Sequence, residues 1–365
     1  MPAKIAFAGG GSGGHVYPLI AVADSIRALD PDALIFFVST RGSIEERLVP
    51  KAGYRLLTVL SGKLSGQAIP RKILTVLKLA VGFFQCLGIL IRERPDLVFS
   101  AGGYAGAPFV FSAWLLGIRC EILEQNRVPG MANRWMAKFC RRVFLNFDES
   151  KEGFPGRETL TVGHPCRREI EDARWDEAEA PVRWRAEPLR IFVFGGSQGA
   201  VGINRLVVGA LPHWKKLNLE ILHQTGQLDH ENVKQGYERV GFSRARVEPY
   251  VYEMAAAYRE AHLVICRAGA SSIAELAAAG KAALLIPLVS RDRHQEHNAR
   301  AVADRGACET RLQPALTGES LAALVEGFYT DRSKLEAYSR EIRKLHRPQA
   351  ARTVAEALLR SVQNA

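Results

Sequence analysis

A short apolar run, a glycine-rich loop and a helical pattern follow one another repeatedly along this chain, and this repeat constrains the fold most strongly. The first copy begins with KIAFA at residues 4–8 and continues into GGGSGGHVYP at residues 9–18. A strand-like run at residues 142–147 closes the first set, and the order then restarts with LRIFVF at residues 189–194 and GGSQGA at residues 195–200. Short apolar runs that alternate with helices predict βαβ units and parallel sheets.

The length of 365 residues suits two domains, because one domain usually spans about 100–200 residues. Residues 175–188 are charged, contain proline and lack periodicity, so they predict a connector. We expect an α/β protein with two doubly wound, Rossmann-like domains facing a cleft, the first over residues 1–163 and the second over residues 164–345. Residues 332–362 have a helical pattern throughout, and the end of the chain, from about residue 346 to residue 365, is expected to pack across the first domain.

The formal net charge of +11 indicates acidic partners such as anionic lipid headgroups or phosphorylated substrates. The lysines and arginines form no long block and no nucleic-acid motif is visible, so we expect no nucleic-acid partner. The six cysteines lie far apart without a C-x-x-C pair, which indicates buried thiols in a reducing compartment. The first residues lack the features of a signal peptide, so a cytosolic location is expected.

The first glycine loop contains the spacing G-x-G-x-x-G at Gly9, Gly11 and Gly14. A glycine loop between a strand and a helix brings backbone N–H groups and the positive end of the helix up to an anion. A site for NAD also needs an acidic residue near the end of the second strand, where this chain has Thr40 and Arg41. Because Arg41 could bind a 2′-phosphate, an NADP-dependent oxidoreductase stays open as an alternative.

The second glycine loop satisfies the nucleophile-elbow spacing G-x-S-x-G at Gly195, Ser197 and Gly199. The other triad members of a hydrolase are formally available as Asp292 and His294, but these lie two positions apart, whereas triad members come from separate loops. A phosphate-binding loop explains Ser197 more simply, because its hydroxyl and the neighbouring N–H groups would bind a phosphate oxygen.

The stretch at residues 266–299 offers several polar groups close together in sequence. Ser272 and Glu275 have the spacing of a capping box, which explains both residues without a ligand. Alternatively, the start of this helix binds phosphate, and the Glu275 carboxylate accepts hydrogen bonds from the two ribose hydroxyls of a nucleotide. Gln295 and Asn298 offer amide groups suited to sugar hydroxyls.

The apolar stretch at residues 71–94 has basic residues at both ends. Its uncharged run from Leu79 to Ile91 is too short to span a bilayer, which needs about 20 apolar residues. The stretch is either a core helix of the first domain or a helix that lies on an anionic membrane surface. In the second case its contact residues include Arg71, Lys72, Lys78, Phe83, Phe84, Arg92 and Arg94.

Segments spread in order along most of the chain carry a specific resemblance. They are GGGSGGHVYP (9–18), GGYAGAP (102–108), EQNRVPGMANR (124–134), VGHPCR (162–167), GGSQGA (195–200) and RAGASSIAELAAAGK (267–281), continued by RDRHQEHNA (291–299). The chain resembles glycosyltransferases of the GT-B fold, and within them the UDP-N-acetylglucosamine transferases that make the lipid-linked disaccharide of peptidoglycan. It departs from their pattern at Gly106, Leu123 and Ala282.

This resemblance implies inverting transfer of N-acetylglucosamine from UDP-N-acetylglucosamine to undecaprenyl-pyrophosphoryl-MurNAc-pentapeptide, by a peripheral protein at the cytoplasmic face of the cell membrane. It implies neither a cofactor nor a metal, and the single D-x-D, Asp30 to Asp32, fits an ordinary turn. A nucleotide-sugar epimerase shares the fold and the donor, and it stays open as a further alternative.

The resemblance assigns the first glycine loop to the acceptor side, where Gly103, Tyr104 and Asn133 also belong. His15 follows this loop and is the candidate base, because histidine titrates near pH 6.5 and can accept the proton of an attacking hydroxyl. Glu124 is the alternative base. The residues implied to bind the donor are Ser12, Gly13, Gly14, Asn126, Arg167, Ser197, Val251, Ala270, Ser271, Ser272, Ile273, Ala274, Glu275 and Gln295.

Overall fold

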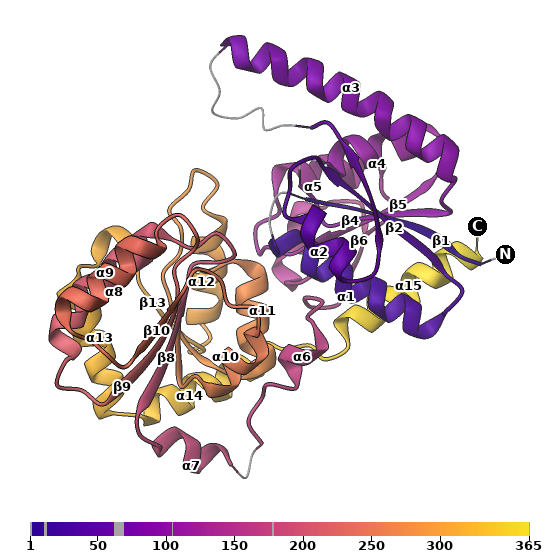
Figure 1. Cartoon of the computed structure of the whole chain (residues 1–365). Coiled ribbons are helices and arrows are strands. Elements are labelled where there is room, and N and C mark those ends of the chain that lie inside the picture. Colours follow the sequence, from indigo (N-terminus) through magenta and orange to yellow (C-terminus); the bar gives the residue numbers. More distant parts are fainter. Residues whose placement is uncertain (1, 11–12, 62–68, 104, 177–178, 365) are drawn as a thin grey trace. The chain divides into compact units, whose positions relative to one another are not determined.

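A computed structural model describes residues 2–10, 13–61, 69–103, 105–176 and 179–364, and the side chains of residues 69–77 and 181 lie outside this description. The chain divides into two compact units (Figure 1). Unit 1 comprises Met1–Arg167 with Gln349–Ala365, and unit 2 comprises Arg168–Pro348. Each unit has its own parallel sheet covered by helices on both faces, which is the expected α/β, doubly wound fold.

Unit 1 contains a seven-stranded sheet in the order β3-β2-β1-β4-β5-β6-β7. The strands are β1 (Lys4–Ala8), β2 (Leu34–Thr40), β3 (Arg55–Val59), β4 (Leu97–Ser100), β5 (Arg119–Glu124), β6 (Arg142–Leu145) and β7 (Glu158–Thr161). The α-helices described around them are α1 (Gly13–Leu29), α2 (Glu45–Lys51), α3 (Ile69–Glu93), α4 (Gly106–Leu115), α5 (Met131–Met136) and α15 (Ala350–Gln363).

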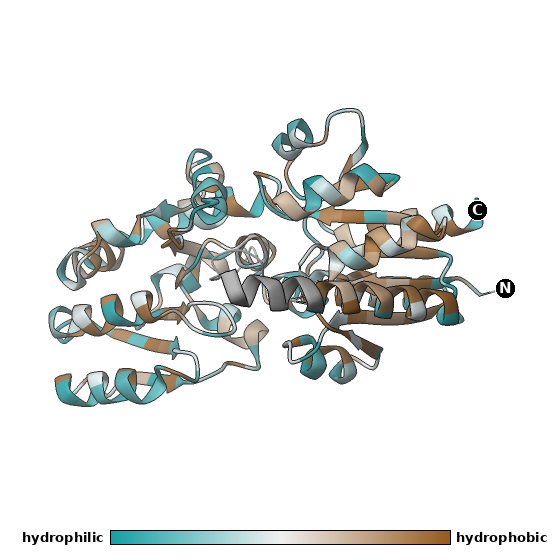
Figure 2. Cartoon of the chain, turned by 90° about the horizontal axis from the view of Figure 1, so that it is seen from above, coloured by the Kyte–Doolittle hydropathy of each residue, from teal (hydrophilic) through white to brown (hydrophobic). Residues whose placement is uncertain are grey.

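Successive residues of β1 show how the core of unit 1 forms. Ile5 and Phe7 point into one apolar cluster, whereas Ala6 and Ala8 point into a second cluster on the other face of the sheet. Helices α1 and α15 contribute to the first cluster, and α3 and α4 contribute to the second. A parallel strand buried on both faces is apolar at most positions, which is why these runs are nearly continuous in the sequence. Figure 2 shows hydrophobic residues along the strands of unit 1.

Unit 2 contains a six-stranded sheet in the order β10-β9-β8-β11-β12-β13. The strands are β8 (Leu189–Phe194), β9 (Leu219–Gln224), β10 (Ala245–Glu248), β11 (Leu263–Cys266), β12 (Ala282–Leu285) and β13 (Glu309–Thr310). The described α-helices are α6 (Arg168–Glu171), α7 (Ala180–Arg185), α8 (Val201–Trp214), α9 (His230–Val240), α10 (Met254–Glu260), α11 (Ala270–Ala279), α12 (His294–Ala303), α13 (Gly318–Thr330) and α14 (Ser333–Arg343).

Three expectations about the organisation of the chain are wrong. The first sheet does not close with residues 142–147, because β7 adds a further parallel strand beside β6. The stretch at residues 175–188 is not a plain connector, since Trp175 and Trp184 are buried in the core of unit 2. Residues 332–362 are not helical throughout, because α14 and α15 are separated near Pro348, whose ring and missing N–H do not suit a helix interior. Helix α15 packs against α1, as Figure 1 shows.

Candidate active site

The strand order reverses once in each sheet, between β1 and β4 in unit 1 and between β8 and β11 in unit 2. The loops that follow the two strands at this reversal point run to opposite faces of the sheet and leave a crevice at its carboxyl edge. Ligands of doubly wound folds bind in this crevice. The glycine-rich segments singled out from the sequence follow directly after these strands, from Gly9 and Ala101 in unit 1 and from Gly195 and Arg267 in unit 2. Each unit therefore brings its motifs to one edge of its own sheet.

In unit 1, the loops after β1 and β4 are in direct backbone contact. Gly103 has a φ of 84°, and a Cβ atom at this position would overlap the backbone of Gly10. A Cβ atom on Gly10 would in turn lie 2.6 Å from the Oγ atom of Ser39. Gly103 therefore permits the close approach of the two loops, because only glycine combines a positive φ with the absence of a side chain.

His15 lies in the first turn of α1, which begins at Gly13 and Gly14. Its ring is half-buried, and burial lowers the pKa of His15 from its usual value of 6.5. A Cβ atom built on Gly102 would lie 3.7 Å from Cδ2 of His15 and 3.0 Å from Oδ1 of Asn133, so these two side chains flank the loop after β4. A neutral imidazole at pH 7 can accept a proton. Ser12 and Tyr104 lie outside the described residues.

Glu124 ends β5 and is buried together with Asn133. Its carboxylate accepts hydrogen bonds from the backbone N–H groups of Asn126, at 2.8 Å, and Gly130, at 2.9 Å. It also accepts from the side-chain amides of Asn126, at 3.3 Å, and Asn133, at 3.0 Å. Nδ2 of Asn133 further donates to the carbonyl of Leu123 at 3.1 Å. Glu124 therefore organises the segment that carries both asparagines.

Arg167 lies at the end of unit 1, where its guanidinium is 4.4 Å from the ring centroid of Tyr17 on α1. Three positions earlier in the sequence, His164 is buried, and its Nε2 atom lies 3.2 Å from Oε1 of Gln125. Burial lowers the pKa of His164 to about 4, so its ring is neutral at pH 7. These contacts place His164 and Arg167, two residues of the VGHPCR motif, in the folded body of unit 1.

In unit 2, the loop with Ser197 packs on the loop after β9. Gly199 has a φ of 76°, and a Cβ atom there would overlap the carbonyl group of Thr225. The buried amide of Gln224 donates through Nε2 to the carbonyl of Gly196 at 2.8 Å and accepts through Oε1 from the N–H of Val251 at 3.3 Å. Gln224 thus joins the Ser197 loop to the segment with Val251. The sequence interpretation missed Gln224, although a polar residue at the end of a buried strand is the signal that could have identified it.

Helix α11 begins at Ala270 after Gly269, whose extended backbone provides the N-cap. Ser272 is therefore the third residue of the helix, and the capping box expected between Ser272 and Glu275 does not form. The carboxylate of Glu275 instead accepts a hydrogen bond from the hydroxyl of Tyr258 at 3.0 Å. Along the first two turns the buried side chains are Ala270 and Ile273, whereas Ser271, Ser272, Ala274 and Glu275 are half-buried.

The amides expected to face sugar hydroxyls hold backbone groups of neighbouring loops. Oε1 of Gln295 accepts the N–H of Leu288 at 2.9 Å, and the buried Asn298 donates to the carbonyl of Ala268 at 3.4 Å. His294 lies 3.3 Å from Asp292 on the same exposed segment. These contacts fix the loops that follow β11 and β12.

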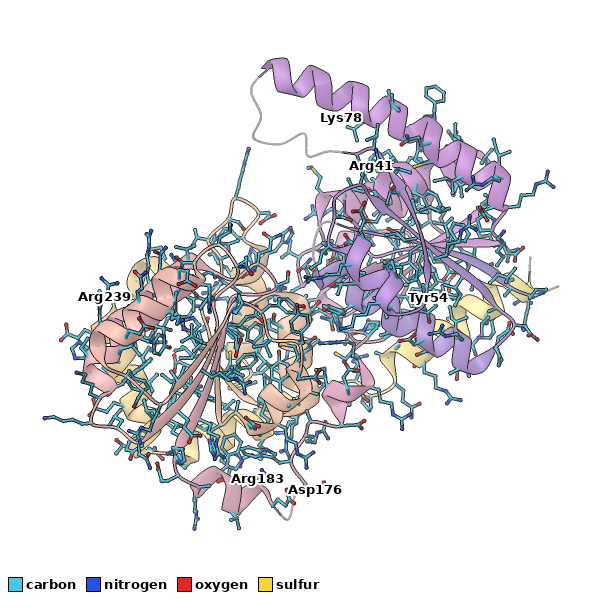
Figure 3. All side chains as sticks on the ribbon, viewed as in Figure 1. Arg41, Tyr54, Lys78, Asp176, Arg183 and Arg239 are labelled. Atoms are coloured by element: carbon cyan, nitrogen blue, oxygen red, sulfur yellow. The ribbon has the colours of Figure 1, made fainter. Side chains whose placement is uncertain are left out.

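Helix α3 has both a buried and an exposed apolar side. Cys86 and Leu90 are buried in unit 1, whereas Val81, Phe84 and Ile91 are 48%, 69% and 58% exposed. One side of α3 therefore packs in the core, as the first interpretation expected, whereas the other side exposes apolar residues to solvent. Exposed Lys78 lies on the same helix (Figure 3).

An aromatic cluster continues from α3 onto its neighbours. The Phe83 ring lies 5.6 Å from that of Phe84 and 6.0 Å from that of Phe111 on α4. Phe111 in turn contacts the rings of Trp114 and Trp135, which are 46% and 40% exposed. Arg92 is exposed at the end of α3 and lies 3.1 Å from Glu93, whereas the side chains of Arg71 and Lys72 lie outside the described residues. Within the described ranges, no helix combines the length and apolar character needed to cross a membrane.

The side chains that the structure describes include no group of three or more His, Cys, Asp or Glu residues arranged to hold a metal ion.

Comparisons with known families match both halves of the chain. Residues 5–145 match the glycosyltransferase family 28 N-terminal domain, and residues 190–354 match the glycosyltransferase family 28 C-terminal domain.

Two similar curated proteins bear the same name, UDP-N-acetylglucosamine–N-acetylmuramyl-(pentapeptide) pyrophosphoryl-undecaprenol N-acetylglucosamine transferase. The protein from Geotalea daltonii is 39% identical over 97% of this chain and 96% of its own length. The protein from Myxococcus xanthus is 38% identical over 97% of this chain and 91% of its own length.

Solved structures of similar fold include Acinetobacter baumannii MurG, with a TM-score of 0.78, 30% identity and coverage of 98% of this chain and 100% of that one. A UDP-N-acetylglucosamine 2-epimerase from Neisseria meningitidis superposes with a TM-score of 0.67 at 12% identity, covering 99% of this chain and 100% of its own, and this likeness extends to the fold alone.

Proposed function

This chain belongs to glycosyltransferase family 28, and we infer that it transfers N-acetylglucosamine from UDP-N-acetylglucosamine to undecaprenyl-pyrophosphoryl-MurNAc-pentapeptide, the conversion of lipid I to lipid II in peptidoglycan synthesis. The observation that carries this inference is the match of nearly the whole chain to transferases of that name. The Neisseria meningitidis epimerase shares only the fold at 12% identity, which favours the transferase over a nucleotide-sugar epimerase.

We assign the donor to unit 2. The start of α11 suits the pyrophosphate, because first-turn N–H groups and the helix dipole attract anions and Gly269 carries no side-chain oxygen to cap them. The Ser197 loop provides further N–H and hydroxyl donors, and Glu275 accepts hydrogen bonds from the ribose. Gln224 supports the assignment of Val251 to the uracil, because it ties that segment to the Ser197 loop.

We assign the acceptor to unit 1, with His15 as the base. In the displacement, a hydroxyl oxygen of the acceptor sugar forms a bond to the anomeric carbon, and the bond from that carbon to UDP breaks with its electron pair on the phosphate oxygen. His15 takes the hydroxyl proton, and a single displacement inverts the α linkage of the donor to β. The lowered pKa of His15 supports this role, because the ring is unprotonated at pH 7. Glu124 acts by ordering Asn126 and Asn133.

We assign the exposed side of α3 to an anionic membrane surface at the cytoplasmic face, because the polyprenyl chain of the acceptor keeps it in a bilayer. Val81, Phe84 and Ile91 are exposed apolar side chains, and Lys78 adds positive charge. The exposed Trp114 and Trp135 extend this surface, since tryptophan favours the membrane–water interface. The net charge of +11 favours anionic lipids.

Calorimetric titration of the full chain with UDP-N-acetylglucosamine, and separately with NADPH, tests the donor assignment. We expect saturable binding of the UDP-sugar, competed by UDP, and none of NADPH. Binding of NADPH without binding of the UDP-sugar would contradict the assignment and favour the oxidoreductase.

A further inference from the structure

We propose that Tyr258 is a positioning residue that holds the Glu275 carboxylate for the ribose of the donor, an inference that rests on the proposed donor function of unit 2. The phenol hydroxyl of Tyr258 on α10 donates to Oε2 of Glu275 on α11 at 3.0 Å. The two residues lie 17 positions apart on consecutive helices that pack together. The bond therefore connects a buried ring with a half-buried acid.

The position of the Tyr258 ring is fixed by its packing. Tyr258 is completely buried, and the rings of Phe192 and Phe194 on β8 meet it edge to face at centroid distances of 5.8 and 6.1 Å. These two strand residues precede the loop with Ser197. A tyrosine held in this way sets the place of its hydroxyl, and through the hydroxyl it sets the place of one oxygen of Glu275.

Such a constraint matters for recognition of a diol. A glutamate side chain has three rotatable bonds, and ordering it on binding lowers affinity because rotamer freedom is lost. A carboxylate that is already oriented by a hydrogen bond avoids this loss and meets the ribose hydroxyls in one geometry. We therefore expect Tyr258 to influence the preference for ribose, and not only the stability of unit 2.

A second role for the same bond is purely structural, since it also joins α10 to α11. The two roles differ in their dependence on the ligand. A structural contact affects UDP and 2′-deoxy-UDP alike, whereas a contact that acts through Glu275 and the ribose affects mainly the ligand with the 2′-hydroxyl.

The experiment compares the dissociation constants of UDP and 2′-deoxy-UDP for the wild type, Tyr258→Phe, Glu275→Ala and the control Tyr237→Phe. Tyr258→Phe removes only the hydroxyl and keeps the packed ring. The control also removes a buried tyrosine hydroxyl in unit 2, one that lies 3.1 Å from Nδ1 of His223. Thermal unfolding of each variant reports the loss of stability separately.

We expect the wild type to bind UDP at least about tenfold more tightly than 2′-deoxy-UDP, because a hydrogen bond to a charged group is lost with the 2′-hydroxyl. Tyr258→Phe should reduce this ratio at least about threefold, Glu275→Ala should reduce it further, and Tyr237→Phe should leave it unchanged.

An unchanged ratio in Tyr258→Phe beside a reduced ratio in Glu275→Ala would overturn the role of Tyr258 and leave the donor assignment intact. If Glu275→Ala leaves the ratio of the two dissociation constants unchanged, both the ribose contact and the role of Tyr258 are overturned. The transferase function would still stand in that case, because a separate transfer assay tests it.

Discussion

Nδ2 of Asn133 lies 3.0 Å from Oε2 of Glu124, and both side chains are buried at the carboxyl edge of the sheet in unit 1. The same carboxylate accepts the N–H groups of Asn126 and Gly130. A carboxylate surrounded by donors from one segment stabilises the conformation of that segment. This arrangement separates Glu124, as an organiser, from His15, as the candidate base.

We expect Glu124→Gln to lower the free energy of unfolding by about 1–3 kcal/mol, because the amide nitrogen would replace an oxygen that accepts hydrogen bonds and leave buried donors unpaired. The fall of kcat at low pH, which we attribute to protonation of His15, is the acid limb of the pH profile and should persist in this variant. Urea unfolding and transfer rates between pH 5 and 9 measure the two quantities. Unchanged stability together with loss of the acid limb would instead identify Glu124 as the base.

We expect His15→Ala to lower kcat by at least about 10²-fold with nearly unchanged donor affinity, since a general base typically contributes this much. Burial lowers the pKa of His15, so the wild-type rate should fall only below pH 6.5, where the imidazole takes up a proton. Single-turnover transfer at saturating donor and acceptor, from pH 5 to 9, measures this, with His213→Ala on the surface of unit 2 as the control. A rate within a few-fold of wild type with the same acid limb would remove His15 from the chemistry.

We expect Phe84→Ser to weaken binding to anionic vesicles about tenfold or more, because insertion of an exposed phenylalanine contributes about 1.5–3 kcal/mol. Phe84 is 69% exposed, so its loss does not open the core; Leu34→Ser, at a 51% exposed position at the start of β2, is the matched control. Wild-type binding should rise with anionic lipid and fall with salt. The membrane assignment of α3 would be refuted if the wild type did not bind anionic vesicles. It would also be refuted if Phe84→Ser and Leu34→Ser weakened the binding equally.

Lys281 provides a test of stability against pH. It is completely buried, with Nζ 3.4 Å from the ring centroid of Trp175 and 3.3 Å from the carbonyl oxygen of Arg259. Burial, followed by the charges of Arg343, Arg183 and Arg259, lowers the pKa of Lys281 to about 6.

In the unfolded chain this lysine titrates near its usual pKa of about 10.4, so between pH 6 and 10 unfolding takes up a proton. Lys281 should therefore make the free energy of unfolding rise by about 1.4 kcal/mol per pH unit in this window, and Lys281→Met should lose that contribution. Urea unfolding of both at pH 7 and pH 8.5 measures it, with the exposed Lys216→Met as the control. Parallel pH dependence of wild type and Lys281→Met would show that the buried amine keeps its proton.

The central part of each sheet could be predicted because β1, β4, β8 and β11 are mostly buried on both faces and therefore appear as predominantly apolar runs. Strands at the sheet edges lack this signal. The edge strand β7 has the sequence ETLT with every residue at least partly exposed, and nothing in its composition distinguishes it from a loop.

The contacts of the candidate site were less accessible to sequence analysis because they join distant residues. Ser272 and Glu275 have the spacing of a capping box, but Gly269 starts the helix earlier and Tyr258 binds Glu275 from another helix. Gln224 bonds to backbone groups 28 and 27 positions away. No local pattern encodes such pairs, which depend on the order of strands in the sheet.

Transfer itself is the most direct test of the function proposed for this chain. The full chain is incubated with UDP-N-acetylglucosamine, labelled in the sugar, and undecaprenyl-pyrophosphoryl-MurNAc-pentapeptide in anionic vesicles, and the lipid and nucleotide products are analysed. We predict one UDP released for each β-linked N-acetylglucosamine added to the lipid, and no change in the donor sugar without the acceptor. A donor converted to its epimer without lipid, or a lipid that gains no label while the donor binds, would contradict the proposed function.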